Sequence, residues 1–127
     1  MTIEEHKSKV ECSEIVENFG YCLGNAFESV WRVSPQNKKS SAHIARAFSF
    51  IKSEIDRRKG FILRGTVLDS YVPDILVERF CKVMEYETGN KGQALTHIFN
   101  AHQNLTAVVP LTCAIVHLSE MMKEVSE

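Results

Sequence analysis

Apolar side chains recur along this chain every three or four residues, with charged and polar positions between them. An α-helix collects residues at this spacing on one face and leaves the polar residues on the other. The segment 23–32 is the clearest example of the pattern. Its apolar positions are Leu23, Ala26, Phe27 and Val30, and its polar positions include Asn25, Glu28 and Arg32. The pattern therefore predicts amphipathic helices.

Six segments of the chain show this helical pattern. They cover residues 3–19, 22–32, 41–59, 70–87, 93–105 and 110–125. Each can bury its apolar face only against another helix. A chain of 127 residues is long enough to form one core without disulfides or metal. We therefore predict an all-α fold, a compact bundle of about six helices, organised as a single helical domain over residues 1–127.

Loops are predicted where Pro, Gly, Asn and Ser gather. Residues 34–41 form the clearest loop, and Ser40 or Ser41 is expected to cap the helix that follows. Gly60 is expected to end that helix in the left-handed conformation. Residues 88–92 are expected to separate the fourth helix from the fifth. Residues 61–68 combine a short apolar run with a glycine, and they fit either a short β element or an irregular connector.

The charge balance excludes a general attraction to polyanions. Fifteen basic and 16 acidic side chains give a formal charge of -1, so we expect no binding to nucleic acid and none to a membrane surface. The N-terminus, MTIEEHKSK, lacks the apolar core of a secretory signal. We therefore expect a cytoplasmic protein with its four cysteines reduced.

No metal or other cofactor is expected. The cysteines are too widely spaced for a CxxC pair. His97 and His102 are five residues apart, which places them on different sides of a helix instead of on the one face that a two-histidine metal site needs. His102 is expected at the edge of the core and His97 at the surface.

The segment from Gly20 to Arg32, GYCLGNAFESVWR, together with the Lys38-Lys39 pair, has a recognisable order of residues. It resembles the phage family named domain of unknown function number 3310, whose pattern is G-Y-C-x-G-N-A/I-x-K-Y-x-x-R followed by a basic loop and a helix. The resemblance covers about residues 14–58. That family includes a nucleoside monophosphate kinase of a short-tailed coliphage. The resemblance thus implies a phage origin, and with it a location in the host cell cytoplasm. It also implies a helical fold, self-assembly and the handling of nucleotides.

The match to this family is incomplete at three positions. Glu28 and Ser29 stand where the family has Lys-Tyr, and His43 stands where it has an acidic residue. These differences favour binding over catalysis. The residues that can be carried over as a ligand-binding site are Gly24, Asn25, Arg32, Lys38, Lys39 and Arg46.

The basic members of this set suit a phosphorylated ligand, because Arg offers a bidentate fork and Lys a point charge. They are Arg32, Lys38, Lys39 and Arg46. The alternative is a solvated basic loop in which Glu28 pairs with Arg32 at i, i+4. Tyr21, Phe27 and Trp31 could stack on a base or belong to the core.

Three functions stay open at this point. The first is a small phage-like helical protein that binds a nucleotide or nucleotide-derived ligand, which could serve to counter host defence. The second is a protein-binding inhibitor of a host factor, and the third is an active nucleoside monophosphate kinase. We also expect a homo-oligomer, because apolar residues occupy more than one face of the last two helices. These residues include Val108, Val109, Val116 and Met121.

Overall fold

The computed structural model describes residues 12–16, 19–63, 74–104 and 107–126, and these residues contain six α-helices. The helices are α2 (Cys12–Val16), α3 (Tyr21–Trp31), α4 (Ser40–Leu63), α5 (Asp74–Met84), α6 (Gly89–Gln103) and α7 (Val109–Ser126). The predicted all-α bundle of about six helices is confirmed. Most of the first predicted helix, residues 3–11, lies outside the described residues.

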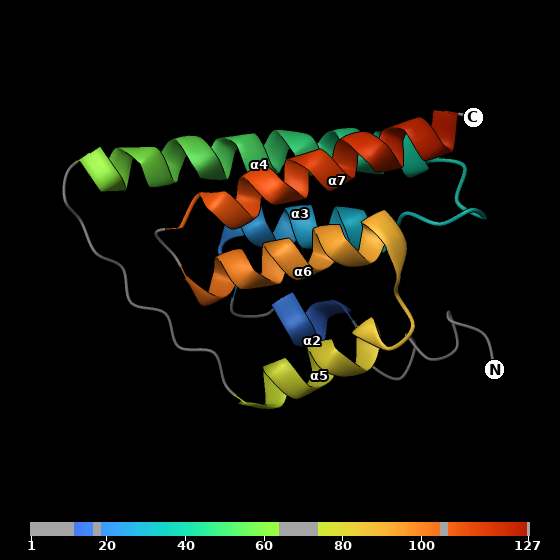
Figure 1. The fold of residues 1–127 in the computed structure, drawn as a ribbon, viewed down its shortest axis with the longest axis horizontal. Helices are drawn as coiled ribbons and strands as arrows, with labels where there is room; N and C mark the ends of the chain where they lie inside the picture. Colours follow the sequence, from blue (N-terminus) through green and yellow to red (C-terminus); the bar gives the residue numbers. More distant parts are fainter. Residues whose placement is uncertain (1–11, 17–18, 64–73, 105–106, 127) are drawn as a thin grey trace.

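Four long helices form a closed ring of neighbours. Helix α3 packs on α4, α4 on α7, α7 on α6, and α6 back on α3. Figure 1 shows α4 and α7 along one edge, α3 and α6 beneath them, and α2 and α5 at the opposite edge. Helix α2 contacts both α3 and α5, so it joins this second pair to the ring. The bundle therefore has a four-helix core with a two-helix layer on one side.

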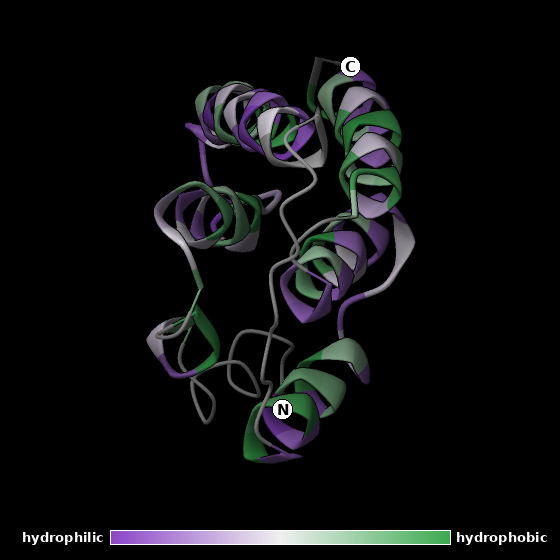
Figure 2. Cartoon of the chain, turned by 90° about the vertical axis from the view of Figure 1, so that its left-hand side faces the viewer, coloured by the Kyte–Doolittle hydropathy of each residue, from purple (hydrophilic) through white to green (hydrophobic). Residues whose placement is uncertain are grey.

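The core consists of the apolar stripes that the sequence pattern placed on each helix. Figure 2 looks along the helices and shows hydrophobic and hydrophilic residues on each of them. Phe27, Phe80 and Phe99 pack together in the middle, and the rings of Phe80 and Phe99 stack at 4.2 Å between centroids. Burying an aromatic or large aliphatic side chain contributes about 1.5–3 kcal/mol. This apolar burial is the main force that holds the helices together.

The turn between α3 and α4 is held by side chains instead of by a regular serine cap. Asn37 donates from Nδ2 to Arg32 O at 2.8 Å and accepts the Lys39 N–H at 2.9 Å. Buried Ser40 accepts the Ser34 N–H, and its hydroxyl oxygen lies 2.8 Å from Asn37 O. The prediction that Ser40 or Ser41 caps α4 is therefore wrong for Ser40. Its hydroxyl instead makes hydrogen bonds to the preceding turn, and these fix the geometry of the connection between α3 and α4.

Two predicted helix boundaries are also wrong. Gly60 lies inside α4, which continues to Leu63, and in the described residues only Gly89 has a positive φ, of 70°. Residues 61–63 are therefore helical and not part of a β element, and residues 64–68 lie outside the described part of the chain. Residues 89–92 do not separate helices, because they form the first turn of α6 behind Thr88 as N-cap.

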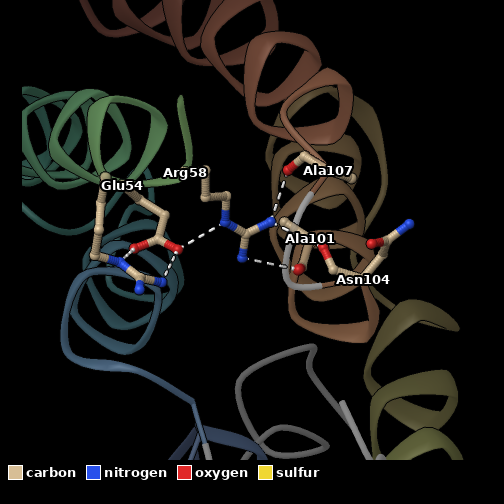
Figure 3. Close-up of polar contacts among 6 residues, drawn as sticks. Glu54, Arg58, Ala101, Asn104 and Ala107 are labelled. Carbon is tan, nitrogen blue, oxygen red and sulfur yellow. Dashed lines mark hydrogen bonds and ion pairs between the residues drawn. The ribbon is translucent and has the colours of Figure 1, made fainter. Parts of the chain in front are cut away.

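The last part of α4 carries a buried arginine two residues before Gly60. Arg58 is fully buried, and its guanidinium reaches carbonyls in the last turn of α6 and just after it. It donates to Ala101 O at 3.0 Å, Asn104 O at 2.9 Å and Ala107 O at 2.7 Å, and its Nε donates to Glu54 at 2.7 Å (Figure 3). Arg58 therefore connects the last part of α4 to the connection between α6 and α7.

In the described residues, no helix combines the length and the hydropathy that crossing a bilayer would require.

Candidate functional site

The candidate site lies along the outer seam between α3 and α4. Tyr21 on α3 meets Phe50 on α4 edge to face, at 5.6 Å between ring centroids. One turn further along α3, Asn25 Oδ1 accepts a hydrogen bond from Arg46 Nη2 at 3.2 Å. Residue numbers rise along α3 as they fall along α4, so the two helices are antiparallel.

Arg46 joins the two ends of this seam. Its guanidinium carbon lies 5.4 Å from the centroid of the Phe50 ring, which is within the range of a cation–π contact. Its Nη2 donates to Asn25, whose own Nδ2 donates to Tyr21 O at 2.7 Å. These contacts hold an exposed guanidinium against an aromatic surface.

Three cations gather around His43 at the other end of the seam. Burial lowers the pKa of His43, and the charges of Arg32, Arg46 and Lys39 lower it further. Arg32, Lys39 and Arg46 are thus all near enough to act on the charge of His43, and a backbone hydrogen bond of 3.0 Å also joins His43 to Lys39. We call the whole set the α3–α4 strip. It consists of Tyr21, Asn25, Glu28, Arg32, Lys39, His43, Arg46 and Phe50.

Glu28 partly neutralises this end of the strip. It pairs with Arg32 across one helical turn at 2.5 Å, and both side chains are about half exposed. The i, i+4 pair that formed the alternative interpretation of the basic loop is therefore present. An exposed pair of this kind contributes only about 0–1 kcal/mol, because water and salt screen it. A bound anion could replace Glu28 at Arg32 with little loss of stability.

The strip unites four of the six residues that the sequence indicated as a site: Asn25, Arg32, Lys39 and Arg46. Gly24 lies on α3, where an added Cβ would meet only Phe19 Cβ at 3.6 Å, so no close backbone approach requires glycine there. Lys38 instead lines a cleft on a different part of the surface, and the other three cations do not line it.

The aromatic residues also separate into two groups. Phe27 is fully buried in the core, and Trp31 is half-buried beside it at 5.9 Å between ring centroids. Tyr21 is 77% exposed and is therefore accessible to a ligand. Of the three aromatic residues proposed from the sequence, Tyr21 is the one placed to stack on a base.

Two histidine contacts were not visible in the sequence. His97 on α6 stacks on His117 on α7, with centroids 5.4 Å apart, and His117 Nδ1 lies 2.9 Å from Asn90 Oδ1. Asn90 Nδ2 donates to the carboxylate of Glu124 at 2.6 Å. Because a carboxylate only accepts, Asn90 Oδ1 must face His117, and His117 Nδ1 carries the proton. The described residues contain no cluster of three or more metal-ligating side chains.

His102 is the other unexpected group. It is 4% exposed, stacks on Phe19 at 4.2 Å, and neither ring nitrogen has a hydrogen-bond partner in the described part of the chain. Burial, and then the charge of Arg58, lower the pKa of His102. These effects favour the neutral form of the ring, and the side chain lies inside the core instead of at its edge.

Comparison of this chain with family models, curated proteins and solved structures found no match. The resemblance to domain of unknown function number 3310 therefore stays a prediction based on the residues of the motif.

Proposed function

We propose that the protein binds a nucleotide or a nucleotide-derived ligand along the α3–α4 strip. The phosphates would lie against Lys39, Arg32 and His43, and the base would lie against Tyr21 and Phe50. Arg46 lies between these two ends and can contact either part of the ligand. By binding such a ligand, the protein would also keep it from a host defence system.

One observation supports the proposal above the others. The antiparallel pairing of α3 and α4 brings a cationic region and an aromatic pair, exposed Tyr21 and half-buried Phe50, onto the same seam. The cationic end suits phosphate oxygens, which Arg and Lys bind through charge-assisted hydrogen bonds. The aromatic end suits a flat base, for which stacking contributes about 1–3 kcal/mol.

The dimensions of the strip suit a nucleotide. Tyr21 and Arg32 are eleven residues apart on one helix. At about 1.5 Å of rise per residue, the strip is roughly 16 Å long. An extended nucleoside di- or triphosphate can span that length with its base at one end and its phosphates at the other.

Isothermal titration calorimetry with mono-, di- and cyclic nucleotides tests the proposal. The variant Arg46→Ala should bind at least about tenfold more weakly, because one hydrogen bond to a charged group contributes about 1.5–3 kcal/mol. Lys82→Ala is the control, since Lys82 is an exposed cation on α5, away from the strip. Absence of heat with every nucleotide, or equal binding by Arg46→Ala and the unaltered protein, would contradict the proposal.

A further inference from the structure

A second concave surface lies at one end of the bundle. It has a volume of about 770 Å³ and is lined by residues 33–38, 40–41, 87–88, 91, 121 and 124–125. In Figure 1 the start of α4, the start of α6 and the end of α7 come together at this end. Small-molecule sites commonly measure about 300–1,000 Å³, so the cleft has the size of a ligand site. None of Asn25, Arg32, Lys39 or Arg46 lines it.

One wall of the cleft is an ion pair fixed by the fold. Lys91 lies 3.3 Å from Glu87, and these side chains are only 15% and 8% exposed. The Lys91 ammonium also donates to Val33 O, which ties the start of α6 to the end of the α3 segment. Because Lys91 and Glu87 neutralise each other, this pair shapes the cleft without giving it a net charge.

Two further charges, of opposite sign, line the cleft. Lys38 makes no ion pair with another described residue and is exposed. Glu124 accepts a hydrogen bond from Asn90 Nδ2 through Oε1, and Asn90 is in turn hydrogen-bonded to His117. This network positions the Glu124 carboxylate and leaves its second oxygen for another donor.

The rest of the lining is partly apolar. Val33, Met121 and Val125 contribute aliphatic surface, and the first two are almost completely buried. Thr88 also lines the cleft, and its side chain does not cap α6. Beside the mutually neutralised Lys91–Glu87 pair, the cleft thus combines Lys38, the Glu124 carboxylate, an aliphatic surface and several hydroxyl groups.

From these features we propose that the cleft binds a free amino acid with an apolar side chain. The ligand carboxylate would pair with Lys38, its ammonium with Glu124, and its side chain would lie on Val33, Met121 and Val125. A ligand with charge of only one sign would meet a like charge at one end, whereas a zwitterion satisfies both. This site is separate from the α3–α4 strip.

The test uses the full chain and calorimetry with leucine, methionine and phenylalanine. Two single-charge analogues of leucine, isopentylamine and 4-methylpentanoate, should bind at least about tenfold more weakly than leucine. Lys38→Met and Glu124→Gln should each weaken leucine binding by a similar factor, since each removes one charge and keeps the shape of the side chain. Lys82→Met is the matched control and should bind leucine normally.

Three results would overturn the assignment. The first is the absence of heat with all three amino acids at millimolar concentration. The second is equal binding of leucine and its single-charge analogues, and the third is unchanged binding by Lys38→Met and Glu124→Gln. Nucleotide binding distinguishes the two sites, because Arg46→Ala should affect only the nucleotide, and Lys38→Met and Glu124→Gln only the amino acid. A nucleotide that loses affinity with Lys38→Met would place the nucleotide in the cleft and would also overturn the assignment.

Discussion

Arg58 is a charged residue whose function in the fold depends on complete burial. All of its recorded hydrogen bonds go to the Glu54 carboxylate or to carbonyls near the end of α6. Burial raises the pKa of Glu54, but hydrogen bonds from Arg57 and Arg58 outweigh this effect and lower it. In the sequence, Arg58 is one of three consecutive basic residues, Arg57-Arg58-Lys59. The three carbonyls that it binds are more than 40 residues away in the sequence, so a local pattern could not identify them.

Replacing Arg58 should strongly destabilise the protein. Arg58→Met leaves three carbonyls without their donor, and loss of one partner of a buried ion pair costs about 3–5 kcal/mol. Arg57→Met is the control, because Arg57 binds the same Glu54 from a side chain that is 45% exposed, and it should cost about 1 kcal/mol or less. Urea unfolding followed by circular dichroism measures both. Similar losses for the two variants would show that Arg58 does not act as the connector described.

His102 should make stability depend on pH. Its pKa is lowered in the fold, so the unfolded chain binds a proton at a higher pH than the native state does. The associated stability is complete above about pH 6.5 and is lost as the pH falls below that value, by up to about 1.4 kcal/mol per pH unit. His102→Phe keeps an aromatic ring beside Phe19 and should reduce this slope.

The comparison requires unfolding free energies at several pH values between 5 and 8. Burial also lowers the pKa of His43 and His97, so some slope should persist in the variant. The difference between the unaltered protein and His102→Phe therefore isolates the buried ring. Identical slopes would mean that His102 is protonated as readily in the fold as in the unfolded chain.

At the scale of whole elements, periodicity predicted most of the helices and glycines misled the prediction of their ends. The stripes of α3, α4 and α7 were visible because apolar side chains recur every three or four residues. Gly60 and Gly89 were both taken as breaks, but the first lies within α4 and the second begins α6. Tertiary contacts stabilise the helical turns that contain Gly60 and Gly89, and the local helix propensity of a residue does not take such contacts into account.

Two helical glycines should respond in opposite ways to the same substitution. A Cβ on Gly92 would lie 2.5 Å from Glu87 O, a backbone atom that cannot move away easily, so Gly92→Ala should cost about 1–3 kcal/mol. A Cβ on Gly24 would make only an ordinary contact with Phe19 Cβ at 3.6 Å. Gly24→Ala should therefore stabilise the protein by about 0.5–1 kcal/mol, since alanine favours the helix.

Thermal or urea unfolding of both variants provides the measurement, and each variant serves as the control for the other. If Gly24→Ala also destabilises the protein, α3 needs glycine for a reason that its packing does not reveal.

For the candidate site too, a local sequence pattern identified only part of the structure. The motif indicated Asn25, Arg32, Lys39 and Arg46, but only the pairing of α3 with α4 revealed their relation to His43 and Phe50.

The whole molecule presents a ring of four helices whose outer surface is not uniformly polar. Val109 on α7 is 72% exposed and Val116 is 57% exposed, whereas Met121, expected on the same outer surface, is buried. Self-association through α7 stays a prediction, and it now depends on Val109 and Val116. Val116→Asp should lower the mass found by light scattering if this surface joins two copies. A monomeric unaltered protein would contradict the prediction directly.

Nuclear magnetic resonance of the His43 imidazole tests the central claim, that the α3–α4 strip receives the phosphates of a nucleotide. In the free protein, burial and the surrounding cations lower the pKa of this ring. A phosphate bound among Arg32, Lys39 and Arg46 favours the protonated ring, so the pKa of His43 should rise when nucleotide is added. The pKa of buried His102 should stay unchanged and serves as the internal reference. A His43 pKa that is the same with and without saturating nucleotide would contradict the account.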